Sequence, residues 1–254
     1  MTKLLLVGES WVSSASHFKG FDQFGSVTFH TGADRFVDGM GRAGIEVTYM
    51  KAHEAAEGFP YRQEDLDAYD VLMLSDIGAN TLLLPPDVWL RGERVPNRLT
   101  MIEAWVKGGG GLIMIGGYMT FQGIDGRGRW HRTPVERALP VTCLPHDDRV
   151  EIPEGAVPEV VDARHPILAG VPSDWPYLLG VNELTPKAED TDVVLRLPEA
   201  QGGLPLLVTG AHGEGRTLAW ASDMSEHWLP KPFLDWPGYD ALFGNMVKWA
   251  ARSL

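Results

Sequence analysis

The residues best placed to do chemistry follow a short apolar run near the middle of the chain. Leu112 to Ile115 has the length and β-branching of a strand buried on both faces, and Gly116 and Gly117 directly after it allow a sharp turn. Tyr118 is the side chain that such a turn exposes. A sharp turn at the carboxyl end of a central parallel strand is where α/β proteins display a nucleophile. The sequence therefore places a phenol at the position of a reactive group.

A phenol restricts the chemistry that this position can support. Its ordinary pKa is about 10, so at neutral pH it is a hydrogen-bond donor and a poor nucleophile. Direct attack by Tyr118 would need a strongly lowered pKa, and the one nearby cation that the sequence offers is Lys19. We predict that Tyr118 acts as a general acid or an oxyanion-stabilising donor, with the backbone amides after Gly116 as an anion site.

The turn resembles the nucleophile elbow of class I glutamine amidotransferases, which reads Gly-x-Cys-x-Gly-x-Gln. Gly116 and Gln122 match this pattern, whereas Tyr118 stands at the cysteine and Thr120 at the second glycine. The only cysteine, Cys143, has no elbow around it. We therefore do not expect glutamine hydrolysis through a cysteine thioester.

The resemblance extends over nearly the whole chain. Gly8 to Trp11 reads Gly-Glu-Ser-Trp and Gly116 to Tyr118 reads Gly-Gly-Tyr, which is similar to a glutamine amidotransferase-like family of cytoplasmic proteins. His165 to Val171 and Asn182 to Leu184 resemble segments of relatives without the glutaminase cysteine, including ThuA-type proteins of trehalose utilisation. For His165 itself we favour a structural role.

In the amidotransferase-like fold the catalytic histidine follows a late strand. The resemblance therefore implies that His227, which follows the strand Thr217 to Ala221, is the base, with Asp223 or Glu226 as the carboxylate that orients it. We take Asp223 as the orienting residue. The alternative is that His227 is an ordinary surface histidine.

A long polar-aromatic segment, Glu9 to Phe24, follows the predicted first strand, Leu4 to Val7, and has no clean hydrophobic period. Loops longer than about 12–15 residues in a compact domain tend to be functional. We predict a ligand-binding loop here, and the alternative is an ordered surface loop. Its candidate ligand-binding residues are Ser10, Trp11, His17, Lys19 and Asp22.

Further candidates follow other predicted strands. Asp76 and Asn80 come after the buried run Asp70 to Leu74, so we expect them in the same crevice, although Asp76 could equally cap the turn. The elbow adds Gly116, Gly117 and Gln122 to the predicted ligand-binding residues.

The surrounding elements alternate between strand and helix. Helical spacing is found at Phe36 to Ala43, Asn97 to Lys107 and Tyr239 to Ala251, with strands such as Ile45 to Tyr49 between them. This alternation predicts an α/β fold with a parallel sheet. With the resemblance, we expect one class I glutamine amidotransferase-like domain over residues 1–254. It would be a flavodoxin-like three-layer sandwich with a central, mostly parallel sheet and a β-rich insertion in the second half.

Bulk composition limits the partners. The net charge of −12 and the absence of any basic run exclude nucleic acid and anionic membrane surfaces as expected partners. The first apolar run is too short for a secretory core, and no stretch approaches the roughly 20 apolar residues of a membrane span. A single cysteine suits a reducing compartment. We expect a cytoplasmic protein with a small-molecule ligand and no cofactor, and a homo-oligomer is the default for this fold.

These features lead to three functional hypotheses. The first is an enzyme that acts on a small polar, carbohydrate-derived metabolite by hydrolysis or acid–base chemistry. The second is a metal-dependent hydrolase that uses His17, Asp22, Asp76 and His227, which are suitable ligand types but form no tight motif. The third is a non-catalytic module that binds a metabolite in the same crevice.

Overall fold

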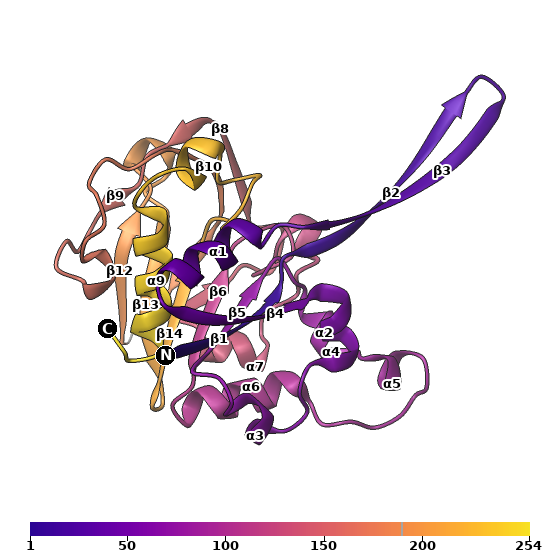
Figure 1. The fold of residues 1–254 in the computed structure, drawn as a ribbon, viewed down its shortest axis with the longest axis horizontal. Helices are drawn as coiled ribbons and strands as arrows, with labels where there is room; N and C mark the ends of the chain where they lie inside the picture. Colours follow the sequence, from indigo (N-terminus) through magenta and orange to yellow (C-terminus); the bar gives the residue numbers. More distant parts are fainter. Residues whose placement is uncertain (189) are drawn as a thin grey trace.

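A central eight-stranded sheet organises the computed structural model, which describes residues 1–188 and 190–254. Its strand order is β4-β1-β5-β6-β14-β13-β12-β9 (Figure 1). The strands are β1 (Thr2–Gly8), β4 (Ile45–Lys51), β5 (Val71–Ser75), β6 (Gly111–Ile115), β9 (Glu159–Val160), β12 (Thr191–Arg196), β13 (Pro205–His212) and β14 (Gly215–Trp220). The first five in spatial order are parallel, and β13 is antiparallel to both of its neighbours. Numbered by appearance, the parallel strands read 2-1-3-4-5, a common order of doubly wound sheets.

Helices cover both faces of this sheet, which explains why strands such as β5 and β6 are buried along their whole length. On one face α1 packs against α9, and the ring centroids of Phe36 and Phe243 lie 5.9 Å apart. The other helices lie mainly on the opposite face (Figure 1). The helices are α1 (Asp34–Arg42), α2 (Ala52–Gly58), α3 (Gln63–Leu66), α4 (Ala79–Leu83), α5 (Pro86–Trp89), α6 (Arg98–Lys107), α7 (Pro134–Ala138), α8 (Lys231–Leu234) and α9 (Tyr239–Ala250), with short 3₁₀ turns η1 (Ile124–Gly126), η2 (Pro166–Leu168) and η3 (Glu199–Gln201). The predicted α/β fold with a mostly parallel sheet is confirmed.

The strongest sequence signals correspond to real elements. The predicted helix from Asn97 is α6, and the Asn97 side chain caps it by accepting bonds from the amides of Leu99 and Thr100. His165 is buried and begins η2, where its Nδ1 accepts a bond from the Ile167 amide. It therefore occupies the structural position expected for it.

The prediction of a loop over Glu9 to Phe24 is wrong. The segment forms β2 (Ser10–Lys19), which pairs with β3 (Asp22–Thr31) in a two-stranded antiparallel ribbon that projects from the body (Figure 1). Alternation of apolar and polar residues identifies a strand only when one face is buried. Almost every residue of this ribbon is exposed, so the pattern is absent from the sequence.

The second half contains the expected β-rich insertion. Two small antiparallel pairs, β10 with β8 and β11 with β7, lie outside the main sheet. Their bounds are β7 (Val141–Cys143), β8 (Arg149–Ala156), β10 (Leu178–Asn182) and β11 (Leu184–Pro186). Within the described residues, none of the helices has the length and apolar character needed to cross a membrane.

Candidate active site

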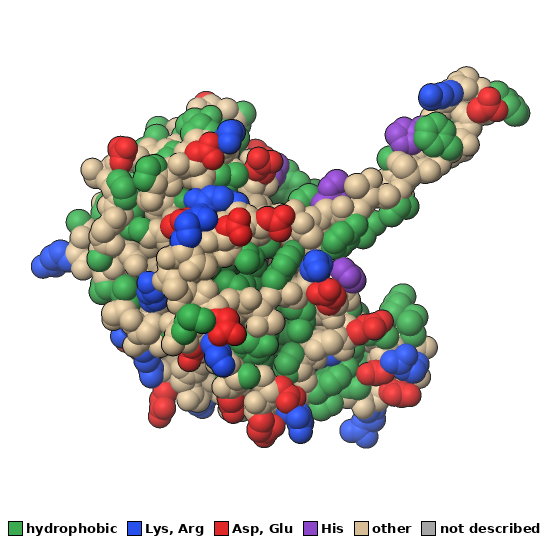
Figure 2. All heavy atoms as spheres, viewed as in Figure 1, with side chains coloured by type: hydrophobic (Ala, Val, Ile, Leu, Met, Phe, Trp, Pro, Cys, Tyr) green, Lys and Arg blue, Asp and Glu red, His purple; other side chains and the backbone are tan. Residues whose placement is uncertain are grey.

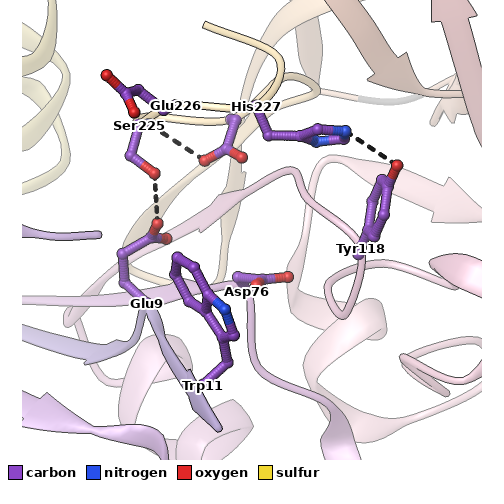
Figure 3. Close-up of a pocket in the computed structure, with 8 residues that line it drawn as sticks. Glu9, Trp11, Asp76, Tyr118, Ser225, Glu226 and His227 are labelled. Carbon is purple, nitrogen blue, oxygen red and sulfur yellow. Dashed lines mark hydrogen bonds between the residues drawn. The ribbon is translucent and has the colours of Figure 1, made fainter. Parts of the chain in front are cut away.

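A cavity of about 260 Å³ opens beside the carboxyl ends of four adjacent parallel strands, β1, β5, β6 and β14. This edge is where doubly wound sheets bind ligands. Each of these strands runs into a segment that supplies part of the wall (Figure 3). The lining residues are Glu9, Trp11, Asp76, Tyr118, Asp223, Ser225, Glu226 and His227.

The structure brings together the two residues expected to form the catalytic pair. The Tyr118 hydroxyl lies 2.9 Å from Nε2 of His227, and the two rings meet edge to face (Figure 3). The same hydroxyl donates to Oε1 of Glu151 at 3.1 Å. A phenol has one proton, so when Glu151 accepts it the Nε2–H of His227 donates to the phenol oxygen. In this arrangement Nε2 of His227 does not act as a base toward Tyr118.

Tyr118 is held in its neutral form. Burial and the neighbouring Glu151 carboxylate raise its pKa, against the opposing effect of Arg149, whose guanidinium lies 4.8 Å from the ring centroid. Arg149 is itself paired with Asp147 at 2.8 Å. A phenol with a raised pKa is a hydrogen-bond donor, which agrees with the predicted chemistry and disfavours direct attack.

Glu9 is a buried carboxyl group in the wall of the cavity. Its oxygens accept bonds from the Ser75 hydroxyl and the Ser225 hydroxyl, both at 2.6 Å (Figure 3 shows the latter). Burial, followed by repulsion from Asp76, raises its pKa to about 7, although both serine bonds act in the opposite direction. A group with this pKa exchanges a proton readily at neutral pH.

Asp76 occupies the anion site that was expected beside the elbow. Its Oδ1 accepts a bond from the Met119 amide at 2.8 Å, and the Tyr118 amide also favours its charged form. Burial has the larger effect and raises the Asp76 pKa. The amide of Gly117 donates to the Asn182 side chain instead. The backbone donors after Gly116 therefore bind groups of the chain itself in this structure, with the Asp76 carboxylate in the place expected for a bound anion.

Asp223 lies in the cavity wall but is not bonded to His227. Its Oδ1 accepts bonds from the amides of Met224 and Ser225 at 2.7 and 3.2 Å. Burial, with repulsion from Glu9 and Asp76, raises its pKa well above the usual range. The geometry does not support the expected orientation of His227 by Asp223. The imidazole instead bonds to the Tyr118 hydroxyl and stacks on the Trp228 ring.

Three residues of the cavity wall have strained backbone conformations. Glu9, Asp76 and His227 have φ values of +46°, +42° and +125°. Non-glycine residues in such conformations cost on the order of 1–3 kcal/mol each, and they persist where the surrounding structure requires them, often at functional sites. Three of them around one acidic cavity support its assignment as the candidate active site.

Several predicted ligand-binding residues lie outside the cavity wall. Ser10 accepts a bond from the Ala52 amide at the start of α2, and Asn80 is exposed on α4. His17, Lys19 and Asp22 lie near the end of the ribbon, where β2 turns into β3. Gln122 bonds to Gly126 and His131 within its own loop. Trp11 and Asp76, by contrast, line the cavity as expected.

The proposed metal ligands are not assembled. His17 and Asp22 belong to the ribbon, whereas Asp76 and His227 line the cavity. Across residues 1–188 and 190–254, no group of three His, Cys, Asp or Glu side chains is arranged to hold a metal ion. The ligand set of the metal-dependent hydrolase hypothesis is therefore wrong.

The elbow is fixed by the β-rich insertion. Asn182 accepts from the Gly117 amide at 2.9 Å and donates to the Gly117 carbonyl, and it also donates to Asp148 at 2.8 Å. Asp148 accepts in turn from the amides of Gln122 and Gly123, both at 2.8 Å. Gly116 has no room for a side chain, because a Cβ there would lie 2.3 Å from the Ala221 carbonyl oxygen.

Sequence reasoning missed Glu9, Ser225, Glu151 and Arg149. A signal for Glu9 was available, because it directly follows the first parallel strand just as Asp76 follows β5. Glu151 and Arg149 belong to β8 in the insertion, and no local pattern places that strand above the elbow. Only the tertiary fold shows that they contact Tyr118.

Comparison with known proteins agrees with this architecture. The sequence matches the model of a family described as "Putative glutamine amidotransferase" over residues 3–252. The chain belongs to this family. Within this glutamine amidotransferase-like protein the one thiol, Cys143, is buried in β7 and does not line the cavity. A search of curated proteins found no match.

Solved structures extend the likeness to the whole chain. A cytoplasmic protein of Salmonella typhimurium is 39% identical, with a TM-score of 0.93 over 97% of this chain and 98% of its own. A second cytoplasmic protein, from Salmonella typhimurium LT2, is 38% identical. Its TM-score is 0.92, and the match covers 98% of this chain and 99% of that protein. A ThuA-like protein from Bacteroides uniformis shares the fold at 14% identity. Its TM-score is 0.56, and the match covers 98% of this chain and 91% of that protein.

Proposed function

We propose that this glutamine amidotransferase-like protein is an enzyme that performs acid–base chemistry, by hydrolysis or proton transfer, on a small polar metabolite such as a carbohydrate derivative. The observation that carries the proposal is Glu9, a buried carboxyl group with a pKa of about 7 in the wall of the cavity. Near that pH, a group can both accept and release a proton, which is the requirement for a general acid or base.

The cavity wall indicates the kind of substrate. Four of its lining side chains are acidic and none is Lys or Arg, so it favours an uncharged polyol or a cationic group over an anion. Trp11 offers an indole face against which an apolar ring face can pack. We assign proton transfer to Glu9 and hydrogen-bond donation to Tyr118, whose raised pKa keeps its proton in place.

A non-catalytic binding module is the second candidate. It is favoured by the fact that both Glu9 oxygens already accept serine hydroxyls, so Glu9 could shape the cavity without reacting. Both candidates suit a cytoplasmic location, which the names of the two Salmonella structures and the single buried thiol support.

The deciding experiment follows a mixture of sugars, polyols, lactones and amino sugars by NMR in the presence of wild-type protein, Glu9→Gln and Tyr118→Phe. We expect wild type to consume a component, with a rate that changes across pH 7. Glu9→Gln should lose the activity, and Tyr118→Phe should lower kcat by roughly 100-fold or more, the typical cost of removing one oxyanion donor. Glu64→Gln, a change at an exposed carboxylate on α3, is the matched control.

Two outcomes would contradict the proposal. Equal turnover by wild type and Glu9→Gln would remove Glu9 from the chemistry. If no component is consumed, but one raises the melting temperature of wild type and Glu9→Gln alike, the binding module is the correct function.

A further inference from the structure

The β2–β3 ribbon, which we call the arm (residues 10–31), has no packing partner along most of its length (Figure 1). Each strand has ten residues, and Gly20, at φ +66°, allows the tight turn at the tip. Only Ser10 is buried, and only His30 and Thr31 are partly covered. A lone two-stranded hairpin is marginal in water unless a further strand or another surface packs against it. The arm therefore requires a covering partner.

The composition of the arm is that of an interface core. Its only charged residues are Lys19 and Asp22, which face each other at the tip, in a protein with 22% charged residues and a net charge of −12. Interface cores are depleted in charge and enriched in aromatics, whereas free sheet edges normally carry charged residues or proline that prevent pairing. The exposed large apolar side chains of the arm are Trp11, Val12, Phe18, Phe21, Phe24, Val27 and Phe29.

The two faces of the arm differ. On one face the aromatic groups cover each other, with Trp11 stacked on His30 at 5.2 Å and His17 on Phe24 at 4.7 Å. The register places Val12 and Phe29 opposite each other on the other face, with Val27 and Phe18 further along it. The exposed fractions of these four side chains run from 46% for Phe29 to 73% for Val27. This second face is the one that needs a partner.

The body of the same chain carries an apolar surface that could receive this face. Leu84, Trp89 and Leu90 are 41%, 73% and 70% exposed, in the segment that follows α4 and includes α5. Figure 1 shows α4 and α5 on the side of the body from which the arm leaves, and Figure 2 shows hydrophobic side chains both on the arm and on the body below it. One chain therefore presents both an arm and a receiving surface.

We propose that two copies of this chain form a twofold dimer by exchanging arms, so that the Val12–Phe29 face of each arm covers the Leu84–Trp89–Leu90 surface of the other copy. Twofold symmetry uses both surfaces twice and leaves neither open. Apart from Lys19 and Asp22 at the tip, the arm carries no charged residue. It can therefore contact a second copy, which has the same negative net charge, without adding repulsion between like charges. Each copy contributes one face of its ten-residue strands together with its receiving surface, and both count toward the roughly 20–30 residues per partner of a stable interface.

Arm exchange would also affect the cavity. β2 starts directly after Glu9, and Trp11 near its base lines the cavity. Docking the arm on a second copy therefore fixes one wall of the candidate active site. The dimer itself does not depend on the proposed function, because the surfaces that form it lie on the arm and on the α4–α5 segment.

The test is the molar mass of the full-length chain by sedimentation equilibrium. We expect wild type to be dimeric. Val27→Lys on the arm and Trp89→Lys on the receiving surface should each raise the dissociation constant by roughly 30-fold or more, as a hot-spot substitution does. Val161→Lys, at a side chain that is 52% exposed next to β9, is the matched control and should stay dimeric. Circular dichroism checks that each variant is folded.

Mixing and hydrogen exchange make the test independent of any single variant. An equimolar mixture of the Val27→Lys and Trp89→Lys chains should form some dimer, because one intact arm can meet one intact receiving surface. In wild type the arm amides should be protected from exchange, and in Trp89→Lys that protection should be lost. A monomeric wild type, a dimer that survives either substitution, or arm amides that exchange freely in wild type would each overturn the proposal.

Discussion

At the scale of single residues, the candidate site depends on how burial changes acidity. Glu9, Asp76 and Asp223 are ordinary carboxyl groups in the sequence, and enclosing them together raises the pKa of each. Desolvation penalises the charged form, and each additional negative charge nearby makes ionisation harder. Serine hydroxyls on Glu9 and amides on Asp76 and Asp223 reduce this penalty without removing it.

The raised pKa of Glu9 predicts how stability depends on pH. Its pKa moves from 4.5 to about 7 on folding, so between these values the folded chain binds more protons than the unfolded chain. The free energy of unfolding should therefore fall as pH rises through this window, with Glu9 contributing roughly 3 kcal/mol. Glu9→Gln removes this contribution, so its stability relative to wild type should increase between pH 5 and pH 8.

Urea unfolding of both proteins across this range is the measurement, with Glu64→Gln as the exposed control. The pKa values of Asp76 and Asp223 are also raised, so the stability of Glu9→Gln should still decline somewhat as the pH rises. Parallel curves for wild type and Glu9→Gln would show that the carboxyl group of Glu9 titrates at its ordinary pKa.

At the scale of elements, the insertion supports the elbow from outside the parallel sheet. Asn182 at the end of β10 and Asp148 just before β8 are buried, and together they bond the backbone of the turn after β6. The phenol of Tyr118 is contacted from the same insertion by Glu151. The β-rich half of the chain is therefore part of the site.

We expect Asn182→Ala to destabilise the protein by about 3 kcal/mol. The change leaves the amide and the carbonyl of Gly117 buried without their Asn182 partner, and each such loss costs about 1–3 kcal/mol, whereas Oδ1 of Asp148 keeps its bond from the Gly123 amide. Asn80→Ala, at an exposed asparagine on α4, should stay within about 0.5 kcal/mol of wild type. Chemical denaturation measures both, and equal stabilities would show that the Asn182 bonds do not support the elbow.

At the scale of the whole molecule, one set of buried side chains joins the elements. The apolar cluster contains residues from Leu4 in β1 to Ala250 in α9, and it includes side chains of the insertion such as Val141 and Leu184. Elements far apart in sequence therefore share one core, and the arm is the exposed exception.

Cys143 gives a direct probe of this core. It is 1% exposed in β7, and burial raises the pKa of its thiol well above the ordinary value. A neutral, enclosed thiol is unreactive, so we expect no labelling of the native protein by a thiol-reactive dye and one equivalent per chain after denaturation. Labelling that follows the rate of global unfolding supports a shared core. Rapid labelling of native protein would show that β7 opens independently.

The sequence was sufficient for features that depend on neighbours along the chain. The buried run Leu112 to Ile115, the helical spacing of Asn97 to Lys107 and the glycine pair before Tyr118 all predict their local structure, because burial on both faces, helical periodicity and turn formation leave marks within a few residues. The tertiary structure decided what lies opposite these elements. It placed Glu9 beside Asp76 and Glu151 beside Tyr118. It also showed that the segment predicted as a loop forms the first strand of the arm. These outcomes depend on contacts between distant segments and on what is left in water, and neither leaves a periodic pattern in the sequence.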